Sequence, residues 1–298
     1  MRRLGLAVLL VLAALPAATA GAADPGRWKL TGYSRIPHTY YQGVTHDPAR
    51  QFFFDGPDTG LWRTDDALTQ QAGTPDVIPP EVTATEGYDH IGDLDWDAAE
   101  GGRVLLPLEC YYPDRPGGEN SCQTGSIGVA DPNTLAWRYY VKLDPAEIPK
   151  AMWAEVSPDG TLLWTSSGND LLAYRVADIN VANAAPTAPP IHSVQRLVGA
   201  VPPSGITGAT FYDGRLFTAG QSGDTFQVWS IDLATGARQL EIERQIVGES
   251  EGLDTLDALG GVLHWIVTPY NPEARPPTYG PQSNVLLHFK PVKGQQKR

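Results

Sequence analysis

The fold is decided by residues 155–164, which have the sequence EVSPDGTLLW. A short extended segment enters Ser157-Pro158-Asp159-Gly160, and a second apolar segment leaves it. Pro presets one turn dihedral and Gly supplies a positive φ, so this is a tight turn between two strands. Tyr212-Asp213-Gly214-Arg215 is a second turn of the same kind. Short strands joined by such turns are typical of all-β domains.

Working outward, a unit of this kind recurs five times. Each copy opens with a strand of small residues, and Gly stands at the matching position in four copies: Gly43, Gly92, Gly208 and Gly252. Glu155 takes that place in the third copy. Positions 43, 92, 155, 208 and 252 are 49, 63, 53 and 44 residues apart. A β-propeller blade repeats every 40–50 residues or so, so we predict an all-β propeller with five four-stranded blades, with six as the alternative.

The remaining strands follow the same order in each copy. No convincing helix is predicted, and the best candidate, residues 145–152, would form one or two turns at most. The last blade lacks a fourth strand of its own, and residues 28–33 have the right composition to supply it. That pairing would close the ring with both chain ends and hide the edges of an open sheet. The expected second, third and fourth strands are 51–54, 103–108, 162–166, 216–219 and 262–268; 60–63, 126–130, 171–176, 226–232 and 284–290; and 137–143, 191–198 and 239–247.

The N-terminal residues predict export. Arg2 and Arg3 precede an apolar run at 4–15, and Pro16 and small residues follow. This is the pattern of a signal peptide, here residues 1–20; an uncleaved anchor is the alternative. We therefore expect a secreted, extracellular protein of bacterial export, with no membrane insertion after cleavage. A single propeller domain would span 28–291, and the basic tail 292–298 would be disordered.

Charge and cysteines narrow the possible partners. The formal net charge is −12, which argues against binding to nucleic acid. The two cysteines, Cys110 and Cys122, are expected to form a disulfide in an oxidising compartment. Neither lies in a CxxC motif or beside a His, so a catalytic thiol is not indicated.

Polar residues are expected to meet at the axis, because the innermost strands of a propeller line it. Carboxylates facing one axis repel one another unless a cation or a proton intervenes. We predict Ca²⁺ or another divalent cation on Asp93, Glu155 and Glu251. His90 and Glu155 are candidate catalytic residues. The alternative is that these side chains are separately hydrogen-bonded around a wet channel. The full set is Tyr41, Gln42, Asp89, His90, Asp93, Glu155, Thr207, Glu249 and Glu251, of which Tyr41, Gln42 and Thr207 would contact a small ligand.

Alternating carboxylates also mark the segment Asp93-Leu94-Asp95-Trp96-Asp97. Every second side chain of a strand lies on one face. The pattern indicates either a cation site at the end of a strand or an acidic solvated face.

Residues 155–164 resemble the blade turn of secreted bacterial propellers. These include the gluconolactonase/senescence-marker family, the YVTN-type surface repeats and the esterase-like phytase group. Glu251-Gly252 resembles the Glu-Gly that opens a metal-binding strand in the lactonase family. The resemblance implies a metal-dependent hydrolase working at the axis. The sequence departs from that family at two places, where Met152-Trp153 replaces Asn-Gly and Ser166-Ser167 replaces the catalytic Asp.

Two functional hypotheses follow. The first is a secreted binding or scaffold propeller whose acidic axial site takes a small ligand, a divalent cation or a protein partner. The alternative is a metal-dependent hydrolase of the lactonase or esterase type at the same site. The sequence contains no GxSxG, Walker A, GxGxxG or HExxH motif, so the binding protein is the first hypothesis.

Overall fold

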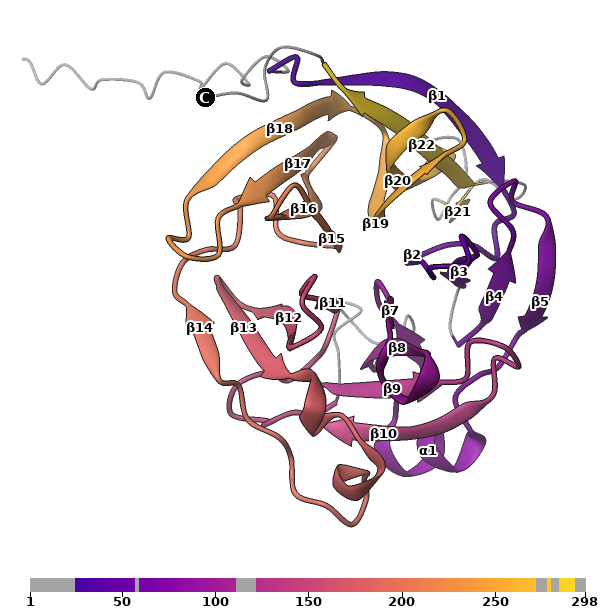
Figure 1. The fold of residues 1–298 in the computed structure, drawn as a ribbon, viewed down its shortest axis with the longest axis vertical. Coiled ribbons are helices and arrows are strands. Elements are labelled where there is room, and N and C mark those ends of the chain that lie inside the picture. Colours follow the sequence, from indigo (N-terminus) through magenta and orange to yellow (C-terminus); the bar gives the residue numbers. More distant parts are fainter. Residues whose placement is uncertain (1–24, 57–58, 111–121, 272–277, 280–283, 293–298) are drawn as a thin grey trace, which may run out of the picture.

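Five sheets form a ring of blades around one axis (Figure 1). The computed structural model of the chain describes residues 25–56, 59–110, 122–271, 278–279 and 284–292. Within each blade the strands pair in an antiparallel order from the axis outward. The prediction of a five-bladed propeller is confirmed.

The first three blades are built as follows. Blade 1 holds β2 (Val44–His46), β3 (Phe52–Asp55), β4 (Leu61–Thr64) and β5 (Gln70–Thr74). Blade 2 holds β6 (His90–Ile91) and β7 (Asp95–Asp97) as its inner strand, then β8 (Arg103–Glu109), β9 (Ser126–Ala130) and β10 (Trp137–Lys142). Blade 3 holds β11 (Glu155–Val156), β12 (Leu162–Ser167), β13 (Asp170–Arg175) and β14 (Gln195–Leu197).

The last two blades follow the same plan. Blade 4 holds β15 (Gly208–Tyr212), β16 (Arg215–Ser222), β17 (Thr225–Ile231) and β18 (Arg238–Gln245). Blade 5 holds β19 (Gly248–Ala258), β20 (Gly261–Asn271), β22 (Asn284–Pro291) and β1 (Trp28–Ile36), and β21 (Thr278–Tyr279) pairs with β20. Figure 1 shows β2, β7, β11, β15 and β19 around the centre.

The two ends of the chain share blade 5, as predicted. β1 pairs antiparallel with β22, with Trp28 opposite Pro291 and Ile36 opposite Asn284. Trp28 then packs edge-on against Phe217 of blade 4. Apolar side chains of neighbouring blades form shared clusters in this way, so the hydrophobic core lies between the blades.

Helix is where the sequence prediction was wrong. α1 (Pro80–Glu86) lies between β5 and β6 and ends at Gly87, whose φ of 85° lies in the left-handed region. Pro80 opens this helix, because a missing N–H costs nothing in the first turn. Residues 145–152, the best helix candidate of the sequence, hold a turn at 145–147 and no helix.

The expected signal peptide, residues 1–20, lies outside the described residues, as do residues 293–298 of the tail. Among the helices described, none is long and apolar enough to cross a membrane. Cys110 and Cys122 are joined by the expected disulfide. The loop that the disulfide closes lies outside the described residues.

Candidate functional site

The inner strands meet at the axis so closely that three positions require glycine. A Cβ on Gly252 would lie 2.7 Å from Gly43 Cα, and one on Gly208 would lie 2.7 Å from Gly252 Cα. Real Cβ atoms do not approach other carbon atoms this closely. The recurring Gly of the sequence is therefore a packing requirement where blades 1, 4 and 5 touch.

Asp93 fills the axis where blade 2 reaches it. The chain leaves the strand ladder between β6 and β7, and the Asp93 carboxylate takes N–H groups from three other blades. Oδ1 accepts from Val44 N at 3.0 Å, and Oδ2 accepts from Ala209 N at 2.8 Å and from Leu253 N at 3.5 Å. The side chain is buried. Burial raises the pKa of the Asp93 carboxyl well above its usual value, against the lowering effect of these N–H groups.

One end of the axis holds most of the ligand contacts predicted from sequence. Tyr41 donates its hydroxyl to Glu249 Oε2 at 3.0 Å. Thr207 Oγ1 lies 3.1 Å from Ser250 Oγ and so is held within blades 4 and 5. Because the inner strands run parallel and these residues precede the glycines, they lie on the same side of Asp93.

His90 belongs to this first end as well. Its Nε2 lies 3.6 Å from Glu109 Oε1. Burial and the nearby Lys150 ammonium lower the pKa of His90 to about 4. His90 is therefore neutral at pH 7.

The other end of the axis opens into a cavity of about 440 Å³. Its wall consists of the last residues of the inner strands and the turns that follow them. A ligand pocket in a protein commonly has a volume of about 300–1,000 Å³, so a small molecule fits. The lining residues are Thr45, His46, Asp47, Pro48, Asp95, Trp96, Asp97, Ala98, Glu155, Val156, Ser157, Pro158, Gly160, Thr210, Phe211, Asp254 and Thr255. We call this the axial cavity.

Hydrogen bonds between neighbouring blades hold the carboxylates of the axial cavity. Asp95 accepts from Thr45 Oγ1 of blade 1 at 3.0 Å and from Val156 N of blade 3 at 2.7 Å. Glu155 Oε1 accepts from Phe211 N of blade 4 at 2.9 Å. These bonds link blades 1 to 4 in order.

Two further contacts close the ring through blade 5. Thr255 Oγ1 donates to the Phe211 carbonyl oxygen at 3.1 Å. Asp254 pairs with His46 Nδ1 of blade 1 at 3.0 Å. All five blades are therefore connected around the cavity, and its carboxylates are fixed by the propeller itself.

The ionisable groups of the axial cavity differ in how the protein shifts their pKa values. The Asp254 carboxylate raises the pKa of His46 to about 9, so His46 is cationic at pH 7. Burial raises the pKa of Asp95 to about 7. The pKa of Glu155 is raised well above its usual value, by burial and then by Asp95 and Asp254. Among the described residues neither Asp95 nor Glu155 has an ion pair.

The structure places the predicted site residues at two ends rather than in one site. Glu155 lines the axial cavity, whereas His90, the other candidate catalytic residue, lies beyond Asp93. The three predicted metal ligands are likewise divided, with Glu155 on one side of Asp93 and Glu251 on the other. In the described part of the chain, the group whose ligand atoms lie within 4.8 Å of one another is a different one, Asp144, Glu147 and His192.

The alternating carboxylates are buried, so the solvated acidic face expected as one alternative is not formed. Asp93 fills the axis, Asp95 lines the cavity, and Asp97 holds the Arg103 guanidinium at 2.6 Å. Sequence reasoning missed His46 and Asp254. His46 stands beside a turn, and its partner lies 208 residues away in the sequence.

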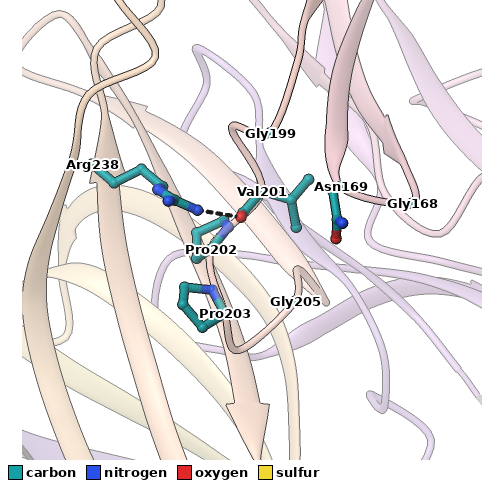
Figure 2. Close-up of a pocket in the computed structure, with 8 residues that line it drawn as sticks. All are labelled: Gly168, Asn169, Gly199, Val201, Pro202, Pro203, Gly205 and Arg238. Atoms are coloured by element: carbon teal, nitrogen blue, oxygen red, sulfur yellow. Dashed lines mark hydrogen bonds between the residues drawn. The ribbon is translucent and has the colours of Figure 1, made fainter.

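A second hollow, of about 430 Å³, lies between blades 3 and 4 (Figure 2). Its wall is mainly glycine, proline and backbone. Arg238 donates to the Val201 carbonyl oxygen, as the dashed line in Figure 2 shows, and Asn169 lies across from it. The hollow has no carboxylate in its wall, so it lacks the chemistry of the axial cavity.

Comparisons with known proteins support the fold. A scan against models of known protein families finds no match, and a search of the curated proteins finds none either. The glutaminyl cyclase of Myxococcus xanthus is 10% identical over 89% of this chain and 97% of that chain, with a TM-score of 0.50. The PQQ-bound aldose sugar dehydrogenase of Streptomyces coelicolor is 11% identical over 90% and 100%, with a TM-score of 0.42. The likeness to the cyclase is one of fold alone and says nothing of function.

Proposed function

We propose that this chain is an exported binding propeller that takes a small polar ligand in the axial cavity. The observation that carries the proposal is the wall of that cavity. It holds Asp95 and Glu155, two carboxyl groups that have no ion pair among the described residues and are fixed by hydrogen bonds from neighbouring blades. A rigid concave site with a few placed polar groups is what small-molecule binding requires.

The fold favours this function because it preorganises the site. The wall residues belong to inner strands whose backbone is fixed by contacts between blades. A ligand therefore has little protein to order when it binds, and ordering is one of the main costs of binding.

Export is the second part of the proposal. The sequence pattern of residues 1–20 supports it, and the Cys110–Cys122 disulfide fits an oxidising compartment. N-terminal sequencing of the protein recovered from the culture medium tests it. A mature N-terminus between residues 18 and 25 is expected, and an intact Met1 on cell-bound protein would contradict export.

The binding site is tested by filling the cavity. The mature protein is screened by thermal shift against amines, amino acids, sugars, organic acids and nucleosides, and each ligand found is titrated by calorimetry. Thr255→Trp places an indole in the cavity wall and is expected to abolish binding. Thr187→Trp, at an exposed loop position, is the matched control and should bind as the unaltered protein does. Ligands that bind Thr255→Trp normally would show that the cavity is not the site.

One observation favours a second candidate, acid–base catalysis in the same cavity. Asp95 lines the cavity with a pKa of about 7, beside Glu155, whose pKa burial raises well above its usual value. A carboxyl group that titrates near the working pH suits proton transfer. Turnover of lactones or esters that is lost in Asp95→Asn would favour an enzyme over a binding protein.

A further inference from the structure

Glu155 is the residue of the axial cavity that indicates a class of ligand. This residue is only 9% exposed, and one of its oxygens accepts the Phe211 N–H. Among the described residues its second oxygen, Oε2, has no hydrogen-bond partner. Oε2 is therefore an unused acceptor on a side chain that is otherwise buried. Because Glu155 lines the axial cavity, a ligand in the cavity can supply the missing donor.

Asp95 provides a second negative group in the same wall. Its partners are hydroxyl and backbone donors, which leave its charge without a cation. His46 is the cation at the rim, and Asp254 already pairs with it. A positive charge added to the cavity would therefore meet Asp95 and Glu155.

The size of the site distinguishes an organic cation from a metal ion. Among the described residues, the ligand atoms of Asp95, Glu155 and Asp254 do not all lie within 4.8 Å of one another, unlike those of the surface group Asp144, Glu147 and His192. One Ca²⁺ holds its oxygen ligands at about 2.3–2.6 Å, so the three carboxylates do not form a compact ligand set around one ion. The volume of about 440 Å³ also exceeds what one ion fills.

The side walls favour a cation that carries a carbon skeleton. Trp96 and Phe211 line the cavity beside the carboxyl groups, and aromatic faces attract cations. The Thr45 and Thr210 hydroxyls lie in the same wall and can accept N–H donors.

Resting on the function proposed above, we infer that the axial cavity selects an organic cation with N–H donors, an ammonium or guanidinium compound, which donates to Glu155 Oε2 and is balanced by Asp95. The cation enters while Glu155 holds a proton, and Glu155 releases that proton to the solvent as the ion pair forms. No bond other than this O–H bond changes.

Binding should therefore depend on pH. The groups that face Glu155 are Asp95, Asp254 and Asp93, and His46 faces Asp254 from blade 1. Burial and these neighbours raise the pKa of Glu155, and burial raises the pKa of Asp95 to about 7. The ionised carboxylates that attract a cation become more abundant as pH rises, and the titration of Asp95 sets the range. The dissociation constant is expected to fall between pH 6 and pH 8.

The test uses calorimetry on the mature protein with four kinds of probe. Putrescine and agmatine carry N–H cations, tetramethylammonium is a cation without N–H, CaCl₂ supplies the metal alone, and glucose is neutral. The amines, tetramethylammonium and glucose are titrated at pH 7.5 in phosphate and in HEPES, whose different ionisation enthalpies report proton release, and CaCl₂ is titrated in HEPES alone. The expected result is binding of putrescine or agmatine with release of protons, and much weaker binding of tetramethylammonium.

Two variants, each of which removes one carboxylate by replacing Glu with Gln, test where the ligand binds. Glu155→Gln is expected to weaken the amine by about 10- to 100-fold, the range for a lost hydrogen bond to a charged group. Glu109→Gln removes a buried carboxylate at the other end of the axis, which lies near Lys150, and should change affinity by less than threefold. Circular dichroism confirms folding, and Asp95→Asn replaces Glu155→Gln if that variant does not fold.

Each of the other possible results would refute the ligand class, the binding function or the location of the site. Tight binding of Ca²⁺ that is lost in Glu155→Gln would replace the organic cation by a metal. Binding of glucose with Glu155→Gln unaffected would refute the cation class while a binding function stands. A protein that binds no member of this panel or of the wider ligand screen would refute both proposals. Equal loss in Glu155→Gln and Glu109→Gln would refute the site.

Discussion

Replacing Asp93 tests the closed axis most directly. In Asp93→Ala the carboxylate that receives N–H groups from blades 1, 4 and 5 disappears. Val44 N and Ala209 N lose acceptors at 3.0 and 2.8 Å, and Leu253 N loses a longer contact at 3.5 Å. These groups are buried at the axis, where the glycine backbones touch.

The expected cost follows from these contacts. A buried N–H left without an acceptor costs about 1–3 kcal/mol. Counting only the two short contacts, Asp93→Ala should lower the free energy of unfolding by about 2–6 kcal/mol, against a total that is commonly about 5–15 kcal/mol. Asp93→Asn keeps one oxygen acceptor and turns its NH₂ group toward a donor, so it should lose roughly half as much.

Urea unfolding followed by tryptophan fluorescence measures both variants at pH 7. The slope against urea should stay the same while the midpoint falls. Asp66→Ala is the control, because Asp66 makes an exposed ion pair with Arg50 and should cost less than about 1 kcal/mol. An Asp93→Ala protein within 1 kcal/mol of the unaltered one would refute the idea that this carboxylate holds the blades together.

Three further predictions concern the rim, the disulfide and the ring closure. The pKa of His46 is about 9 when folded and near 6.5 when unfolded, so its pair with Asp254 adds stability below pH 6.5 and loses it as pH rises through 9. His46→Gln should remove up to about 3 kcal/mol of that pH dependence, and unfolding curves from pH 6 to 9.5 that do not differ between the two proteins would exclude it. Replacing Cys110 and Cys122 by Ala should cost about 3 kcal/mol for a separation of 12 residues, measured as the change in unfolding midpoint. A chain that starts at residue 37 lacks β1 and exposes β22, so it should aggregate and be rescued by a peptide of residues 25–36; a monomer with unchanged thermal stability would contradict the closure.

The strands were predictable because the signal for each is local. Turn residues mark where one strand ends and the next begins, and the predicted third strand 126–130 coincides with β9. The N-terminal strand was predictable from the number of strands in each copy, because the last blade lacked a fourth strand of its own. α1 was not, because a seven-residue helix rests on packing and on the left-handed Gly87 rather than on an apolar pattern of its own.

The site was predictable only in part, for a different physical reason. Sequence shows that polar side chains lie on the inner strands, and the fold brings those strands to one axis. Which end of the axis a side chain faces depends on its position relative to the glycines, and a shift of two or three residues moves it from one end to the other. Asp93 lies between β6 and β7, where it interrupts its own strand and fills the axis. This position depends on contacts with three other blades, so the local sequence does not predict it.

Because the axis is closed by Asp93, this residue also contributes to the electrostatics of the axial cavity. Asp93 lies behind the cavity, and a negative charge on it raises the pKa of Glu155. An ionised Asp93 would attract a proton on Glu155 and a cation in the cavity alike, because a negative charge acts on both in the same direction. Burial raises the pKa of Asp93 and so favours the neutral form. The group that joins the blades therefore also sets the charge that the cavity presents to a ligand, which couples the stability of the ring to its affinity.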